Sequence, residues 1–256
     1  MQWIGLIPAR YASTRFPGKP LAMIAGKPMI QRVYEQACKA IDEVWVATDD
    51  ERIRTCVLGF GGRVLMTSET CRCGTERVCE ALQQLHIQDK EHTVVVNIQG
   101  DEPFIQTEQI EALKSCFINK SDTQIATLVK PYTQEDSWED LENPNSPKVC
   151  FSSTGTALLF SRSVIPYLRG VPKEQWLSHK KHYKHIGMYA YRADILPRLV
   201  ALEPSEIEQC ESLEQMRWIE NGYHIQVAIC HTMSIGIDTP EDLHKATQFA
   251  LQMNKD

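Results

Sequence analysis

Alternation between short apolar runs and helical patterns is the feature that most constrains the fold of this chain. In its first half, runs of strand length are separated by segments with the apolar spacing of amphipathic helices. The expected strands are Trp3 to Ile7, Val44 to Ala47, Val64 to Met66, Val94 to Ile98 and Ile125 to Val129, and the expected helices are Met29 to Ala40, Glu51 to Phe60, Thr75 to Leu85 and Thr107 to Asn119. This order predicts an α/β fold of three layers, in which helices cover both faces of a mostly parallel, twisted sheet.

The second half of the chain is less regular. It begins after a hydrophilic segment, Tyr132 to Lys148, which indicates a long surface loop. We expect strands at Ala157 to Ser161, Ile186 to Tyr191 and Gln226 to Cys230, a helix at Cys210 to Glu220, and a final helix with Thr239 as N-cap and Pro240 as its first residue. Residues 1–256 are predicted to form one domain, to which about 148–230 add further elements.

The charge of the chain argues against nucleic acid as a partner. Its formal net charge is −6, so the basic surface that attracts DNA or RNA is not expected. No run approaches the roughly 20 consecutive apolar residues that span a bilayer, and the first residues lack the charged start of a signal peptide. We expect a cytoplasmic protein with no membrane insertion.

Nine cysteines are scattered mostly through apolar segments, as small buried side chains in a reducing compartment would be. Cys71 and Cys73 are the exception, because a CxC pair can ligate zinc. No second Cys or His pair stands at a matching spacing. We therefore do not expect zinc at these two residues.

Because ligands of such folds bind beyond the carboxyl ends of strands, the loops that follow strands are where function is expected. The segment from Pro8 to Leu21 leaves the first strand with three cations, Arg10, Arg15 and Lys19, among small residues. Cations and backbone N–H groups in such a loop suit a triphosphate, which carries about four negative charges. The spacing is not that of a Walker A loop.

Carboxylates mark two further loops. Gln99-Gly100-Asp101-Glu102-Pro103 ends a buried strand, where an acidic residue is costly unless it meets a cation. Mg²⁺ prefers a few carboxylates together with substrate phosphates. Asp238, before Thr-Pro, is by itself an ordinary helix entry. From the residues alone, the chain is expected to be a phosphate-binding, metal-dependent α/β enzyme.

Five motifs in this order resemble those of the 3-deoxy-manno-octulosonate cytidylyltransferase (CMP-Kdo synthetase) family, from about residue 3 to about residue 245. They are PARxxSTRxPGKPL, a GTER helix entry, QGDEP, KHIGxYxY with ESLEQMRWIENG, and IDTPEDL. The resemblance implies a Rossmann-like nucleotidyltransferase (glycosyltransferase-A-like) topology. Cys71 and Cys73 depart from the His and Ser that are usual in the family, and Met216 and Ile219 stand in place of Leu.

The resemblance also implies roles for individual residues. Lys19, Asp101 and Asp238 would be catalytic, and the two aspartates would bind Mg²⁺. The nucleotide CTP would contact Ala9, Arg10, Ser13, Arg15, Lys19, Gly74, Thr75 and Arg77. The sugar would contact Gln99, Arg162, His185, Tyr189, Glu214 and Gln215. His185 and Tyr189 fall on one face of a regular strand, as a contacting pair would.

The activity implied is transfer of CMP from CTP to the anomeric hydroxyl of Kdo, an eight-carbon acidic sugar, for lipopolysaccharide biosynthesis. Three alternatives stay open. The first is another acidic sugar, such as 8-amino-Kdo or a sialic acid. The second is a glycosyltransferase that uses a ready-made nucleotide sugar, although Lys19 and its loop would then have no triphosphate to bind. The third is a non-catalytic nucleotide-binding module. The family is usually homodimeric, and the second half of the chain is the expected source of that surface.

Overall fold

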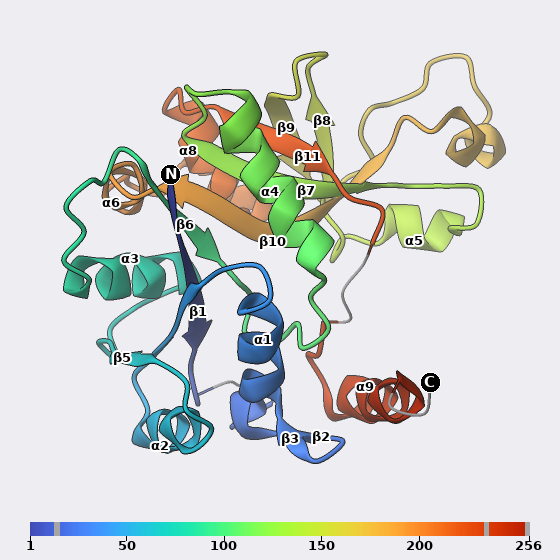
Figure 1. Cartoon of the computed structure of the whole chain (residues 1–256). Coiled ribbons are helices and arrows are strands. Elements are labelled where there is room, and N and C mark those ends of the chain that lie inside the picture. The colour runs from blue at the N-terminus through green and yellow to red at the C-terminus, as the bar shows by residue number, and fades with distance from the viewer. Residues whose placement is uncertain (13–15, 233–235, 254–256) are drawn as a thin grey trace. The chain divides into compact units, whose positions relative to one another are not determined.

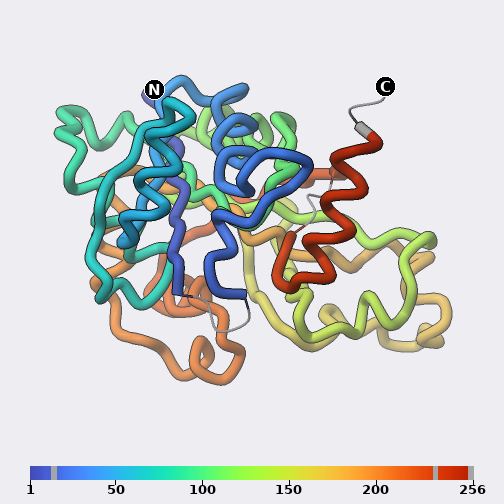
Figure 2. The backbone as a smooth tube through the Cα atoms, turned by 90° about the horizontal axis from the view of Figure 1, so that it is seen from below, coloured from blue at the N-terminus to red at the C-terminus, as the bar shows by residue number. Residues whose placement is uncertain are grey.

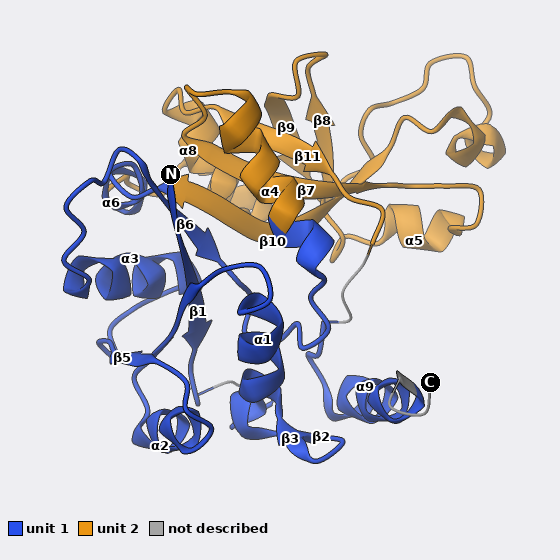
Figure 3. Ribbon diagram, viewed as in Figure 1, with its two compact units in different colours: residues 1–110, 192–200, 233–256 blue, residues 111–191, 201–232 orange. Residues whose placement is uncertain are grey.

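The computed structural model describes residues 1–12, 16–232 and 236–253 of the chain. The chain divides into two compact units, drawn in different colours in Figure 3: unit 1 comprises residues 1–110, 192–200 and 233–256, and unit 2 comprises residues 111–191 and 201–232. Each unit is described by itself below. The expectation of a single domain stays a prediction.

Unit 1 is built on four parallel strands in the order β6-β1-β4-β5. The apolar runs of the sequence supply these strands, and all five residues of β6 are buried, as expected for a parallel sheet covered on both faces. The strands are β1 (Gln2–Ala9), β4 (Glu43–Thr48), β5 (Val64–Met66) and β6 (Thr93–Asn97).

Helices connect these strands and pack against them. The apolar face of α1, formed by Met29, Ile30, Val33 and Ala37, is fully buried. A small hairpin and a 3₁₀ turn lie between β1 and α1. The elements are η1 (Lys19–Leu21), β2 (Met23–Ile24), β3 (Lys27–Pro28), α1 (Met29–Ala37), α2 (Glu51–Gly59), α3 (Gly74–Gln84), α6 (Leu196–Val200) and α9 (Pro240–Met253).

The order of strands reverses at β1. From β1 the chain steps to β4 and β5 on one side, and it then returns through α3 to β6 on the other side (Figure 1). Because parallel crossovers are right-handed, α3 covers the opposite face of the sheet from α1 and α2. The loops that follow β1 and β6 therefore diverge at the carboxyl edge, which is where α/β sheets of this kind bind ligands.

The C-terminal helix α9 belongs to unit 1 although the chain reaches it from unit 2. It lies beside β2, an element from the opposite end of the chain, in both Figure 1 and Figure 2. As expected, the helix begins at Pro240, and the backbone N–H of Asp242 donates to the hydroxyl of Thr239. This placement brings Asp238, at the entry to α9, back to the first strands of the chain.

Unit 2 contains a mixed sheet in which β7 pairs with β11 in parallel and with β10 in antiparallel orientation, and β8 pairs with β10 and β9. Its strands are β7 (Ile125–Pro131), β8 (Lys148–Phe151), β9 (Ala157–Ser161), β10 (Tyr183–Arg192) and β11 (Ile225–Ile229). Its helical elements are α4 (Thr107–Asn119), which starts in unit 1, α5 (Trp138–Glu142), η2 (Lys173–Gln175), η3 (Leu177–His179), α7 (Glu206–Glu211) and α8 (Gln215–Glu220).

The predicted α/β class with mostly parallel strands is confirmed. None of the helices among the described residues is long and apolar enough to cross a membrane.

Two expectations for the second half were wrong. The single helix expected over Cys210 to Glu220 is two helices, because Ser212 adopts a left-handed backbone conformation, with φ of 50°, and ends α7. The hydrophilic segment from Tyr132 to Lys148 is not all loop. It contains α5, which a capping box between Ser137 and Asp140 starts.

Candidate active site

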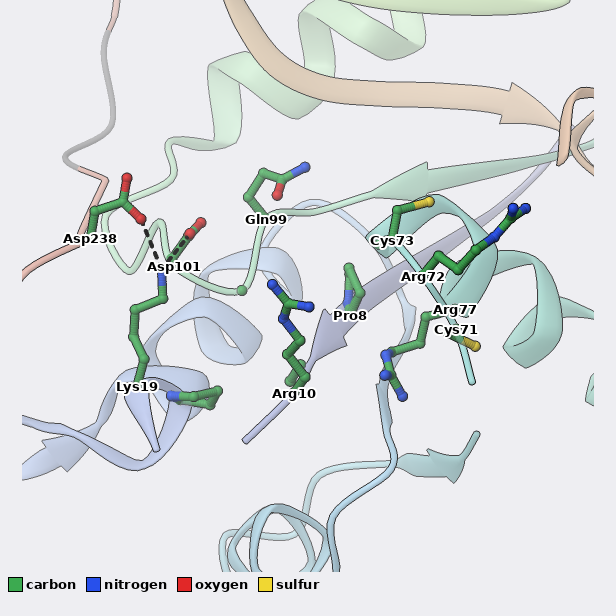
Figure 4. A pocket seen from close by; sticks show the side chains of 14 residues that line it. Pro8, Arg10, Lys19, Cys71, Arg72, Cys73, Arg77, Gln99, Asp101 and Asp238 are labelled. Carbon is green, nitrogen blue, oxygen red and sulfur yellow. Dashed lines mark hydrogen bonds and ion pairs between the residues drawn. The ribbon is translucent and has the colours of Figure 1, made fainter. Parts of the chain in front are cut away.

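A cavity of about 400 Å³ lies in unit 1 where β1 and β6 end (Figure 4). Loops after β1 and β6, the entry to α3 and the entry to α9 all contribute to its wall. Eight residues predicted from the sequence line it together: Ala9, Arg10, Lys19, Gly74, Arg77, Gln99, Asp101 and Asp238. Thr75 lies next to them but is buried in the first turn of α3, and Ser13 and Arg15 lie outside the described residues.

The ammonium group of Lys19 joins the two predicted metal ligands. Its Nζ lies 2.7 Å from Oδ2 of Asp101 and 3.2 Å from Oδ1 of Asp238, and it donates a third hydrogen bond of 2.9 Å to the carbonyl of Ile237 (Figure 4). An ammonium group has three protons, so these contacts use all of them. One cation and two carboxylates from three distant segments thus meet at one point in the cavity.

The loop after β1 presents Lys19 through a fixed turn. Gly18 has a left-handed backbone with φ of 71°, and its N–H donates to the carbonyl of Tyr11 at 3.0 Å. The guanidinium of Arg52 stacks on the Tyr11 ring, 3.3 Å from the centroid, and Asp50 binds the other side of that guanidinium through both carboxylate oxygens. These contacts hold the ends of the loop on unit 1 and orient Lys19 toward the cavity.

Backbone contacts bring the two acidic segments together. The N–H of Ile237 donates to the carbonyl of Asp101 at 3.0 Å, and the Ile237 side chain is fully buried. A side chain at Gly100 would place its Cβ 2.8 Å from the carbonyl oxygen of Pro8, which is too close, so only glycine allows the loop after β6 to lie against the end of β1. The position of Asp101 relative to Lys19 and Asp238 therefore depends on main-chain fit.

Arg77 lies at the cavity but is tied into the protein. It is 3% exposed, and its guanidinium donates to Oδ2 of Asp49 at 2.7 Å and to the hydroxyl of Thr67 at 2.6 Å. Arg77, on α3, thus binds the loop after β4 through an ion pair and the loop after β5 through a hydrogen bond. Sequence reasoning missed Asp49, although it stands at the carboxyl end of a strand, where acidic residues were sought. A role of Arg77 in nucleotide binding stays a prediction.

Cys71 and Cys73 also line the cavity, at the entry to α3. The thiol of Cys71 donates to Oε2 of Glu80 at 3.1 Å, and Oε1 of Glu80 accepts the N–H of Ser68 at 2.7 Å. Burial, and after it the Glu80 carboxylate, raise the pKa of the Cys71 thiol to about 11. Within the described parts of the chain, no group of three or more His, Cys, Asp or Glu side chains is arranged to hold a metal ion.

Unit 2 contains the residues predicted for the sugar other than Gln99, which lines the cavity of unit 1. The rings of His185 and Tyr189 lie 5.4 Å apart on β10, although a bulge between Ile186 and Tyr189 interrupts the simple alternation that was expected. Nε2 of His185 lies 3.0 Å from the hydroxyl of Thr127, and loss of solvation lowers the pKa of His185 to about 3. The imidazole is therefore neutral at physiological pH.

Several buried polar atoms in the described part of unit 2 are unsatisfied. Nε2 of Gln215 has no hydrogen-bond partner among the described residues, and the hydroxyl of Tyr189 lies beside Thr127 without making a hydrogen bond of ordinary geometry. Burial, and after it the charge of Glu214, raise the pKa of Tyr189 well above its ordinary value, so the hydroxyl keeps its proton and can donate it in a hydrogen bond. Glu214 itself accepts a hydrogen bond of 3.1 Å from Arg217. Buried donors without a partner are costly, which makes them candidates for contact with a polar ligand.

Arg162 was predicted to contact the sugar, but its guanidinium is already bonded within the protein. Its guanidinium donates to three backbone carbonyls, those of Glu211 at 2.5 Å, Pro144 at 2.8 Å and Ser212 at 3.3 Å. The carboxylate of Glu211 in turn accepts from the hydroxyl of Ser161 and from the N–H of Arg162. These bonds fasten the turn after α7 to β9, and no sequence signal revealed them.

Comparisons with known proteins identify the family that this chain resembles over most of its length. The cytidylyltransferase family model matches residues 4–229 and ends before Asp238. The 3-deoxy-manno-octulosonate cytidylyltransferase of Phocaeicola vulgatus is 57% identical over 252 residues, with 98% of each chain covered. The protein of the same name from Porphyromonas gingivalis is 53% identical over 246 residues, which cover 96% of this chain and 95% of the relative.

Solved structures extend the comparison. A structure of CMP:2-keto-3-deoxy-manno-octonic acid synthetase complexed with CTP matches with a TM-score of 0.88 and 38% identity, covering 99% of this chain and 100% of that one. A 4-diphosphocytidyl-2C-methyl-D-erythritol synthase from Anaerococcus prevotii matches with a TM-score of 0.60 at 14% identity, covering 98% of this chain and 99% of that one. The second likeness concerns the fold alone.

The raised pKa of Cys71 gives a pH-dependent prediction. Only the thiolate is alkylated, so with a pKa of about 11 Cys71 should react slowly with iodoacetamide at pH 8, when about one thiol in a thousand is ionised. Glu80→Gln removes the neighbouring negative charge while keeping an acceptor oxygen, so it should lower the pKa and speed labelling. Mass spectrometry of the Cys71 peptide between pH 7 and 10 measures this. The exposed Cys210 is the internal reference, and equal labelling of the two thiols in the unmodified protein would contradict the prediction.

Proposed function

This chain belongs to the cytidylyltransferase family, as its motifs predicted, and we propose that it transfers CMP from CTP to the anomeric hydroxyl of 3-deoxy-D-manno-octulosonate (Kdo). The products are CMP-Kdo and pyrophosphate, and the reaction activates Kdo for lipopolysaccharide biosynthesis. The observation that carries this proposal is the meeting of Lys19, Asp101 and Asp238 in one cavity, in a chain more than half identical to the relative from Phocaeicola vulgatus.

The cations of the cavity suit the triphosphate of CTP. Lys19 and Arg10 line it, and the side chain of Arg10 extends into the space between Lys19 and Pro8 (Figure 4). A lysine ammonium on a flexible stem can follow the charge that develops on the α-phosphate, and an arginine can bind phosphate oxygens in pairs. Gly74 and Ala9 present backbone at the same wall, where a nucleotide can approach closely.

Asp101 and Asp238 fit a magnesium ion by their chemistry. Both carboxylates already approach one cationic group, the ammonium of Lys19, and carboxylate oxygens together with substrate phosphates are the ligands that Mg²⁺ prefers. Bound there, Mg²⁺ would neutralise charge on the phosphates and lower the pKa of the attacking hydroxyl. Its binding would also free Lys19 to interact with the nucleotide.

The reaction requires little covalent chemistry from the protein. The anomeric hydroxyl oxygen of Kdo forms a bond with the α-phosphorus and its proton passes to solvent, while the bond from that phosphorus to the bridging oxygen breaks and pyrophosphate leaves. Residues of this chain contribute by positioning the two substrates and by stabilising charge. No covalent enzyme intermediate is required.

For the sugar, we assign contacts to Gln99, His185, Tyr189, Glu214 and Gln215. The unpartnered hydroxyl of Tyr189 and amide nitrogen of Gln215 support this, because a sugar rich in hydroxyls would supply the missing partners. The neutral imidazole of His185 can donate or accept. Arg162 is assigned to the sugar side indirectly, because it holds the turn after α7 against β9.

We also propose that the protein is a cytoplasmic homodimer that does not bind nucleic acid and does not insert into a membrane. Large apolar side chains are exposed on unit 2, among them Leu158 at 59%, Tyr167 at 73% and Ile229 at 47%. Such side chains favour burial against a second copy. All nine cysteines are free, as in proteins of a reducing compartment.

A substrate panel tests the function. We predict that pyrophosphate is released rapidly only with CTP and Kdo, when each of four nucleoside triphosphates is combined with Kdo, 8-amino-Kdo and a sialic acid. Release coupled to an enzymatic colour reaction measures each rate. Faster turnover of 8-amino-Kdo or of a sialic acid would show that this sugar, and not Kdo, is the substrate. Absence of pyrophosphate release with every pair would contradict the proposed activity.

Asp101→Asn is predicted to remove nearly all turnover. A neutral amide is a poor substitute for a carboxylate on Mg²⁺, so we expect a loss well above tenfold, or more than about 1.4 kcal/mol in the barrier. The neighbouring Glu102→Gln makes the same chemical change outside the cavity wall and is the control, expected to keep most of the rate. Retention of more than about a tenth of the unmodified rate by Asp101→Asn would contradict the metal assignment.

Tyr189→Phe and Glu214→Ala are predicted to impair the use of Kdo far more than the binding of CTP. Each removes a polar partner worth roughly 1–3 kcal/mol in a buried site, which corresponds to about a fivefold to 150-fold rise in KM for Kdo. Calorimetry with CTP and Mg²⁺, without sugar, follows the nucleotide separately. An equal loss of CTP affinity would contradict the sugar assignment and would show that both residues bind the nucleotide or support the fold.

A further inference from the structure

The backbone of Asp238 is fixed by a residue outside the cavity, Asp242. One carboxylate oxygen of Asp242 accepts three hydrogen bonds: from the N–H of Asp238 at 3.1 Å, from the N–H of Thr239 at 3.0 Å and from the hydroxyl of Thr239 at 2.8 Å. The hydroxyl of Thr239 in turn accepts the N–H of Asp242. Asp238 therefore enters α9 with its main chain bonded to the first turn of the helix, while its side chain faces Lys19.

The other side of α9 is anchored by apolar packing. Ala246 and Ala250, which are 0% and 2% exposed, pack in one cluster with Ile24, Met29 and Phe104. The ring of Phe249 meets the ring of Phe104 edge to face, with centroids 5.0 Å apart. Such contacts fix the position of a helix along and across its packing surface.

This cluster contains chain neighbours of all three site residues. Phe16 and Ala22 lie on either side of Lys19 in the sequence, Phe104 follows Asp101, and the buried Ile237 precedes Asp238. Neither Asp242 nor Phe249 is among the described residues that line the cavity. Both nevertheless act on the segments that carry the two carboxylates.

We propose that Asp242 and Phe249 are positioning residues for the divalent cation, and that α9 holds Asp238 where it can share that cation with Asp101. This inference rests on the proposed function. Two carboxylates repel each other, so a cation binds both tightly only when the protein keeps them together before it arrives. Partners that orient metal ligands typically contribute about 10- to 100-fold in metal affinity.

The test compares Asp242→Ala with Glu241→Ala. Glu241 is the adjacent acid, and it pairs with Lys245 at 2.9 Å on the exposed side of α9, so its removal changes the charge equally without touching Asp238. The full chain, without nucleotide, is titrated with Mn²⁺, and the free ion is followed by its EPR signal. We expect affinity about tenfold weaker or more for Asp242→Ala, unchanged affinity for Glu241→Ala, and largely restored affinity for Asp242→Asn, which keeps an acceptor oxygen.

Kinetics supply a second readout. At saturating CTP and Kdo, Asp242→Ala should raise the Mg²⁺ concentration that gives half-maximal rate, while kcat at saturating Mg²⁺ stays near that of the unmodified enzyme. Phe249→Ala should shift Mn²⁺ affinity and Mg²⁺ midpoint in the same direction, and Phe249→Leu should shift them less. Phe249 is 37% exposed, so its variants are expected to fold, and thermal unfolding verifies this for every variant.

The outcomes separate the two proposals. Equal Mn²⁺ affinity in Asp242→Ala and Glu241→Ala, or a fall in kcat with an unchanged Mg²⁺ midpoint, would overturn the positioning role. If Asp242→Ala does not fold, unchanged cation affinity in Phe249→Ala would overturn it, and a weakened affinity in Phe249→Ala would support it. An unmodified protein that binds Mn²⁺ yet releases no pyrophosphate from CTP and Kdo would instead contradict the proposed function.

Discussion

The contact of Lys19 with Asp101 and Asp238 is the interaction on which the candidate site depends. Two carboxylates at the carboxyl edge of the sheet repel each other, and the ammonium group of Lys19 offsets that repulsion. Its third proton forms a hydrogen bond with the carbonyl of Ile237. The three segments are far apart in the sequence, so their meeting is a property of the tertiary fold. A site that already balances these charges around one cation is suited to exchange that cation for Mg²⁺ and a nucleotide.

The topology of unit 1 explains why the site lies where it does. Strand order reverses between β1 and β6, so the loops that follow these two strands diverge and leave a cavity at their carboxyl ends. The loop after β1 supplies cations, the loop after β6 supplies a carboxylate, and α9 returns from the end of the chain with the second carboxylate. Gly100 lets the two loops approach, because any side chain there would collide with the carbonyl of Pro8.

Much of the fold and of the candidate site could be predicted from the sequence. The features that could not be predicted have physical reasons in common. Apolar periodicity predicted the bounds of β5, α4 and β9 as they are observed. Resemblance to the family, rather than periodicity, identified Asp238. The break at Ser212 and the carbonyl partners of Arg162 could not be predicted, because they depend on a single backbone dihedral and on contacts between distant segments. The backbone hydrogen bonds of Ile237 with Lys19 and Asp101 could not be predicted either, because they do not depend on the type of its side chain.

Anomalous diffraction from crystals grown with CTP and Mn²⁺ tests the central claim most directly. We predict a Mn²⁺ peak at coordination distance, about 2.0–2.2 Å, from carboxylate oxygens of Asp101 and Asp238. The triphosphate should lie against the same ion, and the ammonium of Lys19 should have turned from the carboxylates to a phosphate. A peak bound elsewhere, for example at Cys71 and Cys73, or CTP bound with no metal between the two aspartates, would contradict the proposed centre.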